Sequence, residues 1–193
     1  MLTRAYRSIH ALGLALPLMV GLATVSQAQP APRPETLQAG LSGRWTGYLE
    51  YRDYQSNQAF RLPMVSDMSV APDKATVTRL SSFDDGPQTG TVYITTTTLF
   101  GDAEATSAMF RKGRKVELIT DQTLVARFVD ATHWTVIYER DGVDGDQPSR
   151  IRETETRDGG TLTRLKEVKP LGAEDSAYAF RNTSVLSHLS AAQ

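Results

Sequence analysis

The chain has 193 residues, of which 40% are hydrophobic, and its formal net charge at neutral pH is −1. This length suits one domain with a sizeable core once a targeting segment is set aside. The near-balanced charge argues against a general binder of nucleic acids or anionic membranes, because such proteins show a basic excess. Cysteine is absent, which excludes disulfides, thiol catalysis and cysteine-ligated metals.

The first 28 residues have the three parts of a secretory signal peptide. Arg4 and Arg7 form a basic start, residues 11–25 are almost wholly apolar, and Ser26-Gln27-Ala28 offers small residues for cleavage. A retained membrane anchor is the alternative, and the shortness of the apolar run disfavours it. We therefore expect an exported protein, periplasmic or secreted, that has a signal peptide over 1–28 and no stable membrane anchor.

Residues 29–40 contain three prolines in alternate positions and predict a flexible, extended linker. A short helical turn over Leu37–Leu41 that closes the base of the following domain is an alternative for the end of this segment. We expect a single β-barrel domain over 41–185 and a flexible tail over 186–193.

From Gly43 onward the sequence predicts strands separated by short turns. Between residues 43 and 54, side chains alternate with a period of two: Trp45, Leu49 and Tyr51 share one face. The predicted strands are 43–53, 59–70, 75–83, 89–98, 104–111, 115–120, 123–130, 133–140, 149–157, 161–168 and 178–185. Such short connections favour an all-β antiparallel meander, closed or nearly closed into a barrel of eight to ten strands. An open Greek-key sandwich is the alternative.

The Gly43-x-Trp45 motif at the start of the first strand resembles the opening signature of lipocalins and other calycin-type β-barrels. The resemblance implies a calycin-like barrel with Trp45 at its closed base. It also implies that a basic side chain from the last strand packs over the indole, and Arg181 occupies the expected place. Gly43, Trp45 and Arg181 are therefore the expected structural signature.

Aromatic residues supply the candidate binding site. A barrel lined by tyrosines suits an amphiphilic molecule, because each ring offers apolar area with a polar tip. The alternative is that these aromatics are core residues or cross-strand pairs. The residues selected as candidate ligand contacts are Tyr48, Tyr51, Tyr93, Trp134 and Tyr138.

Strand 149–157 is unusual because it has charged residues on both faces. We favour an exposed edge or solvated face, since edge strands often bear charge that discourages pairing. The alternative is a wet lumen into which Glu153 and Glu155, or Arg150 and Arg152, project. The acidic segment Asp141–Asp146 lacks the spacing of a calcium loop and predicts a hairpin turn.

No pattern selects catalytic residues, a metal site or a cofactor. His133 and His188 are far apart in the sequence and lack a metal-binding spacing, so a haem held by one of them remains only a minor alternative. We expect a binding protein for a small hydrophobic or amphiphilic molecule, without nucleic acid and with no protein partner defined. The alternative is a non-enzymatic structural or interaction protein with a packed barrel that acts through loops or an edge strand; an enzyme is less favoured.

Overall fold

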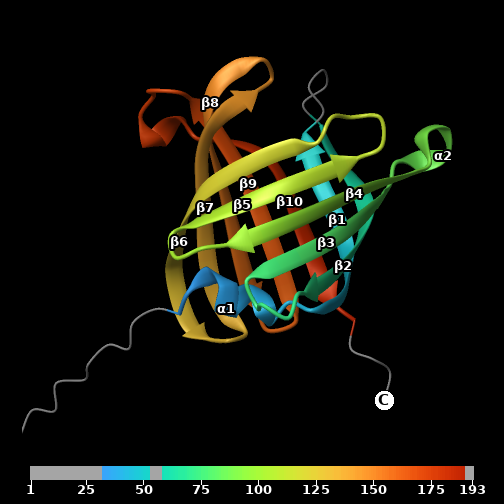
Figure 1. Cartoon of the computed structure of the whole chain (residues 1–193). Helices are drawn as coiled ribbons and strands as arrows, with labels where there is room; N and C mark the ends of the chain where they lie inside the picture. Colours follow the sequence, from blue (N-terminus) through green and yellow to red (C-terminus); the bar gives the residue numbers. More distant parts are fainter. Residues whose placement is uncertain (1–31, 53–57, 190–193) are drawn as a thin grey trace, which may run out of the picture. The chain divides into compact units, whose positions relative to one another are not determined.

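The computed structural model describes residues 32–52 and 58–189, and within them ten strands close into a barrel (Figure 1). All neighbouring strands are antiparallel, each pairs with the next in the chain, and β10 pairs with β1. The strands are β1 Gly43–Arg52, β2 Ala59–Val70, β3 Thr76–Asp84, β4 Thr91–Phe100, β5 Glu104–Arg111, β6 Glu117–Asp130, β7 His133–Asp144, β8 Gln147–Asp158, β9 Thr161–Pro170 and β10 Ala179–His188. The predicted meander barrel is confirmed.

Two details of the strand prediction are wrong. The predicted strands 115–120 and 123–130 form one strand, β6, and Asp121, which we expected in a connection, is buried in the middle of it. The acidic segment also belongs largely to β7, which ends at Asp144, so only Gly145 and Asp146 separate β7 from β8. In both places an aspartate that is typical of turns is instead paired with a cation inside the barrel, Asp121 with Arg140 and Asp144 with Lys166.

A short helix, α1 (Pro34–Ala39), lies at the base of the barrel, where the linker was expected. Pro34 occupies the first turn, where its missing N–H leaves no helical hydrogen bond unmade. Leu37, Gln38 and Leu41 are buried, so the flexible-linker prediction is wrong for this part of the segment. The expected tail also begins too early, because β10 continues to His188. The signal peptide lies outside the described residues.

The apolar core is concentrated at this closed base. Trp45 and Trp134 are fully buried, and their indole N–H groups donate to the carbonyls of Leu41 (2.8 Å) and Ala131 (3.2 Å). Each buried side chain of this size contributes roughly 1.5–3 kcal/mol of hydrophobic stabilisation. The remaining core residues are Leu37, Leu41, Met68, Val77, Phe100, Ala105, Val136, Tyr138, Leu162 and Leu186.

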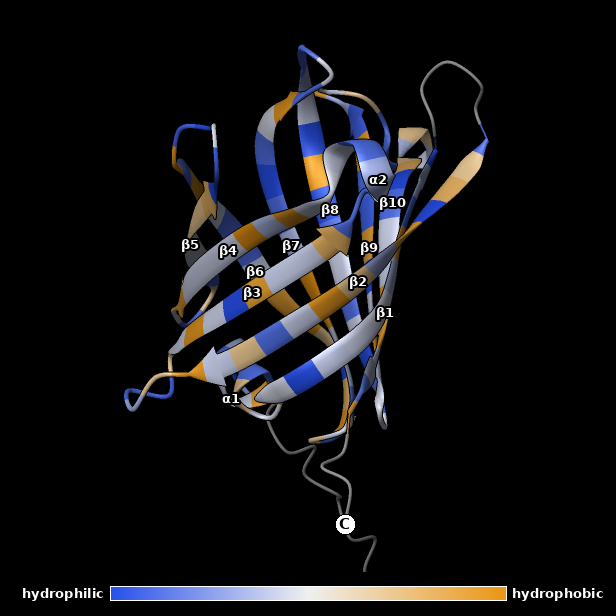
Figure 2. Ribbon diagram, turned by 90° about the vertical axis from the view of Figure 1, so that its right-hand side faces the viewer, coloured by the Kyte–Doolittle hydropathy of each residue, from blue (hydrophilic) through white to orange (hydrophobic). Residues whose placement is uncertain are grey.

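Hydrophilic and hydrophobic residues alternate along the strands (Figure 2), as expected for strands with one face toward the barrel interior. Two short helices complete the described structure: α2 (Gly86–Thr89) between β3 and β4, and a 3-10 turn (Asp175–Ala177) before β10. None of the helices in the described residues is long and apolar enough to cross a membrane.

Candidate functional site

The charged strand β8 lies inside a closed sheet, paired with β7 on one side and β9 on the other. The interpretation of β8 as an edge strand is therefore wrong. Glu153 and Glu155 project into the lumen, while Arg150 and Arg152 pair with Glu139 on the outside. The alternative of a wet, charged lumen describes β8 correctly, because alternation along the strand places every second side chain inside.

Glu155 is the most deeply buried ion of the lumen, with no exposed surface. Arg79 from β3 reaches across the barrel and binds it with two hydrogen bonds, of 2.7 Å and 3.0 Å. Gln38 of α1 donates to Glu155 at 2.6 Å and to the Tyr138 hydroxyl at 2.9 Å, and its carbonyl accepts from Arg79. The base helix and three strands are thus joined by one polar cluster.

Two further cations continue this network toward the open end. Arg164 of β9 donates to Glu153 at 2.7 Å and to Glu155 at 3.3 Å. Arg140 of β7 donates to Asp121 at 2.7 Å and to Glu153 at 3.3 Å. Three arginines therefore balance three carboxylates, and the network as a whole carries no net formal charge.

The electrostatics keep the carboxylates ionised. Burial would raise the pKa of Glu155, but the charges of Arg79 and Arg164 outweigh burial and lower this pKa to about 2. For Glu153, the cations Arg164 and Arg140 likewise overcome burial and lower the pKa to about 2. Neither carboxyl group holds a proton near neutral pH, so neither is suited to act as a general acid. The pKa of Tyr138 is raised, chiefly by burial and then by the charge of Glu155.

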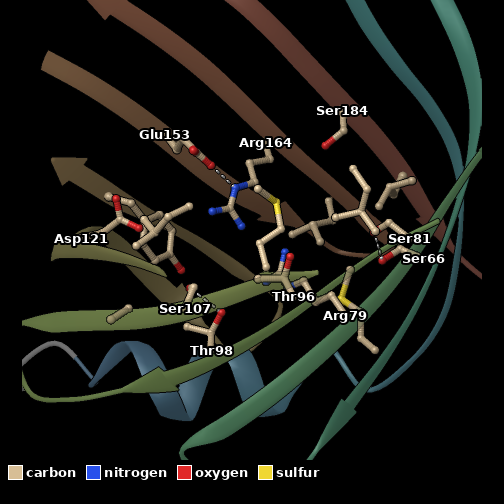
Figure 3. A pocket seen from close by; sticks show the side chains of 18 of the residues that line it. Ser66, Arg79, Ser81, Thr96, Thr98, Ser107, Asp121, Glu153, Arg164 and Ser184 are labelled. Atoms are coloured by element: carbon tan, nitrogen blue, oxygen red, sulfur yellow. Dashed lines mark hydrogen bonds and ion pairs between the residues drawn. The ribbon is translucent and has the colours of Figure 1, made fainter. Parts of the chain in front are cut away.

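An inner cavity of ≈230 Å³ lies beside this network. One of its walls carries the charged side chains of Glu153, Arg164 and Arg140 together with Tyr138. The opposite wall, on β2–β5, presents small hydroxyl groups, and two pairs of them are joined across strands, Ser66–Ser81 (3.2 Å) and Thr98–Ser107 (2.8 Å) (Figure 3). Apolar side chains from β2 to β6 also line the cavity, among them Met64, Met68, Phe83, Ile94, Phe100, Met109 and Ile119. The cavity is therefore amphipathic.

The inner cavity continues toward the end of the barrel opposite α1. An outer cavity of ≈520 Å³ shares several lining residues with it, among them Met109, Ile119 and Glu153. Near the mouth, Asp144 accepts from Lys166 at 3.3 Å and forms an ion pair with Arg181 at 2.9 Å. The lumen thus extends from a sealed apolar base, past a charged layer, to the mouth.

The structure separates the five aromatic candidates. Tyr138 lines the inner cavity, and Tyr51 lies at the mouth, where its ring packs against Phe60 at 5.6 Å. Tyr48 and Tyr93 do not line the lumen. The Tyr48 ring lies under the exterior side chain of Arg61, and Tyr93 is 59% exposed. Trp134 belongs to the sealed base. The expectation of a tyrosine-lined lumen is therefore wrong for three of the five, and binding at Tyr51 or Tyr138 stays a prediction.

The predicted contact between Trp45 and Arg181 is wrong, because Arg181 lies at the mouth with Asp144. Arg157 of β8 takes this place: its guanidinium lies 5.8 Å from the Trp45 ring centre. Arg157 also donates to the carbonyls of Gly40 (2.8 Å) and Gly159 (3.2 Å). The basic side chain at the closed end thus comes from β8 instead of the last strand.

Both histidines lie at the closed end of the barrel and line neither the inner nor the outer cavity. His188 packs edge-on against Trp45 at 4.8 Å, and His133 contacts Asp130 at 3.0 Å. Among the described residues, no group of three or more His, Asp or Glu side chains is arranged to hold a metal ion.

No family model and no curated protein matches the sequence. Among the solved structures that resemble it is one described as the crystal structure of Rv2717c from M. tuberculosis, with a TM-score of 0.56 and 13% sequence identity. The similarity covers 82% of this chain and 100% of that chain. At this identity it supports the barrel fold and carries nothing about a ligand or a reaction.

Proposed function

We propose that the protein is an exported binding protein that holds a small, partly apolar molecule in the barrel lumen. The observation on which the proposal rests is the amphipathic cavity that continues to the mouth. A cavity with mostly apolar walls and a few fixed polar groups is typical of small-molecule sites. Export is inferred from the signal peptide predicted over residues 1–28.

The charged wall indicates which ligands fit. Arg140 and Arg164 are already paired with carboxylates, so a strongly charged ligand would have to displace an existing partner. A neutral or zwitterionic polar group can instead add hydrogen bonds to the paired side chains without upsetting their balance. The apolar part of the ligand would lie against Met64, Phe83, Met109 and Ile119 on the other wall.

Native mass spectrometry of the mature protein, purified from its own exported fraction, tests the proposal, with an absorption spectrum recorded alongside. We expect a stoichiometric additional mass that disappears on denaturation, and a Soret band would identify that mass as haem. Ile119→Trp, which fills the shared part of both cavities, should abolish the additional mass. Thr120→Trp is the matched control, because Thr120 is exposed on the outer face of the same strand. A folded protein without any additional mass, even when freshly isolated, would contradict the proposal.

The alternative is an interaction protein that works through its surface. Because the described strands form a closed barrel, they leave no edge strand through which a partner could bind. A different observation favours this alternative: exposed apolar side chains lie on the outer faces of adjacent strands, including Leu80, Tyr93 and Phe110. Ligand-free protein that nevertheless co-purifies with a stoichiometric protein partner would support this alternative.

A further inference from the structure

The turn between β5 and β6 is the most basic segment of the described structure. It contains four cations within five residues, Arg111, Lys112, Arg114 and Lys115, and all four are exposed. Most arginines elsewhere in residues 32–52 and 58–189 form ion pairs, as in the lumen, whereas the structure records none for these four side chains. Glu117, the first residue of β6, is the nearest acid in the sequence, and Asp84 and Asp85 lie at the same end of the barrel. The turn therefore has a local positive excess that its neighbours only partly offset.

Apolar side chains flank the cations on the outer face of the same hairpin. Phe110 is 46% exposed, Val116 54% and Leu118 78%. In the antiparallel register, Met109 faces Glu117 and Ala108 faces Leu118, so Phe110 and Val116 are the next residues of the two arms toward the turn. Exposed aliphatic and aromatic groups beside lysine and arginine are typical of segments that lie in a membrane interface.

The hairpin stands at the open end of the barrel, opposite α1 (Figure 1). Its inner face contributes directly to the lumen, since Met109 and Ile119 line the inner and outer cavities. A small cavity of ≈210 Å³ connects this region with the cations: it is lined by Ile94, Met109, Arg111, Arg114, Lys115 and Glu117. A surface that binds the hairpin therefore lies next to the lumen mouth.

We propose that the hairpin Phe110–Leu118 docks the protein on an anionic lipid surface. The four cations bind lipid headgroups, and Phe110, Val116 and Leu118 enter the interface beneath them. Clustered lysines and arginines are attracted to an anionic leaflet over about one Debye length, so a local cluster can dock a protein whose overall charge is near zero. The proposal departs from the expectation based on net charge alone, because net charge does not register how cations are clustered.

Nucleic acid is the competing anionic partner. A nucleic-acid surface uses cations together with polar or stacking side chains. Of the three apolar groups beside this cluster, only Phe110 has a stacking face, and Val116 and Leu118 offer neither a hydrogen bond nor a stacking face. Lipid is therefore the partner that the chemistry favours. Docking would bring the lumen mouth close to the membrane, from which a ligand could enter. Such delivery rests additionally on the proposed binding function, whereas docking itself does not.

Co-sedimentation of the mature protein with vesicles tests docking, at about 0.1 M salt. The vesicles contain phosphatidylglycerol and phosphatidylcholine in roughly equal parts, and pure phosphatidylcholine vesicles serve as the reference. We expect binding only to the anionic vesicles. Lys112→Glu/Lys115→Glu should weaken it on the order of 25-fold or more, since each cation lost costs roughly fivefold. Val116→Ser/Leu118→Ser should weaken it as well, while leaving a residual attraction that rising salt removes.

Lys74→Glu/Arg127→Glu is the matched control, because it makes the same charge change at exposed positions away from the hairpin. This control should bind like the original protein, and circular dichroism should show all variants folded. Equal losses in the control and hairpin variants would overturn the proposal, as would the absence of binding to anionic vesicles. Hairpin-dependent binding to duplex DNA or RNA without vesicle binding would overturn it in favour of a nucleic-acid partner. Loss of the lumen ligand with docking intact would contradict only the proposed binding function.

Discussion

At the scale of single residues, two glycines, Gly43 of the opening motif and Gly47 two residues after Trp45, set the geometry of β1. Gly43 has a φ of +126°, a region that other residues rarely adopt, and a Cβ there would lie 2.7 Å from His188 Nε2. Gly47 has no such φ, but a Cβ there would lie 1.9 Å from the carbonyl oxygen of Val185 on β10. The motif is therefore required where β1 and β10 close the barrel, which is why it marks a fold without marking a ligand.

Gly47→Ala should destabilise the protein strongly, because the methyl group meets backbone instead of a side chain that can rotate away. We expect a loss at the upper end of the range for overpacking, about 3 kcal/mol of unfolding free energy in urea. Gly160→Ala is the control: its Cβ would meet nothing within 4 Å, so its stability should stay within about 0.5 kcal/mol of the original. Similar values for the two variants would refute the close-approach explanation.

The same scale shows why the signature could be predicted only in part. Trp45 is at the closed base, as the resemblance implies, but its basic neighbour is Arg157. Arg157 and Arg181 both lie near strand ends, and choosing between them requires knowing which end of each strand lies beside the base. β8 runs toward the base and ends there at Asp158, whereas Arg181 lies near the start of β10, at the mouth.

At the scale of elements, α1 depends on one polar residue for its place in the base. Gln38 is fully buried and contacts Tyr138, Glu155 and Arg79 from three strands. The short helix has no side-chain cap, and a helix of this length is not stable by itself. Its order therefore comes from Gln38 together with the buried Leu37 and Leu41.

Gln38→Leu should loosen this helix more than it unfolds the barrel. The variant leaves the buried Tyr138 hydroxyl without its Gln38 partner and removes one hydrogen bond each from Glu155 and Arg79, which costs roughly 1–3 kcal/mol. We expect faster amide hydrogen exchange over 34–41, with exchange in β4 and β5 unchanged. Glu35→Gln is the control, because the side chain of Glu35 points away from the cluster toward Arg33. Uniformly faster exchange throughout the barrel would show that Gln38 supports the whole fold and not the base alone.

Elements were predictable where their period was clear. The alternation in β1, β2 and β5 gave their bounds to within a residue or so, because one face is apolar. The prediction was wrong for β8, because glutamates such as Glu153 and Glu155 are typical of a solvent-exposed face. Their burial could be predicted only from the cations of distant strands that pair with them. Arg79 and Arg164 come from β3 and β9, and no local pattern in the sequence announces that they meet at Glu155. Only the closure of the sheet brings them together.

At the scale of the whole molecule, the buried charges make the barrel depend on pH. A buried pair that is intact offers little net stability over an apolar pair, but losing one partner leaves an uncompensated charge and costs about 3–5 kcal/mol. Protonation of Glu155 at low pH is a loss of this kind. The three arginines would then face fewer carboxylates within the same lumen.

Stability should therefore fall in acid. The pKa of Glu155 is lowered to about 2 in the folded protein, against about 4.3 for an ordinary Glu. Its contribution is thus complete above the unfolded value and is lost as the pH falls from about 4 toward 2. By linkage this amounts to about 3 kcal/mol of unfolding free energy, which urea titrations across this pH range measure.

The double variant Arg79→Met/Glu155→Leu separates this explanation from general acid unfolding. It removes both members of the pair, so its unfolding free energy at neutral pH should stay within a few kcal/mol of the original. Between about pH 4 and 2, unfolding of the variant should take up about one proton fewer than unfolding of the original protein, so its stability should fall less steeply. Arg61→Met/Glu50→Leu is the control, because that pair lies on the outer surface, where ion pairs contribute little. An acid dependence that is the same in the original protein and the lumen double variant would mean that carboxylates outside this pair govern acid unfolding. The charged layer would then serve the cavity wall without controlling the stability of the barrel.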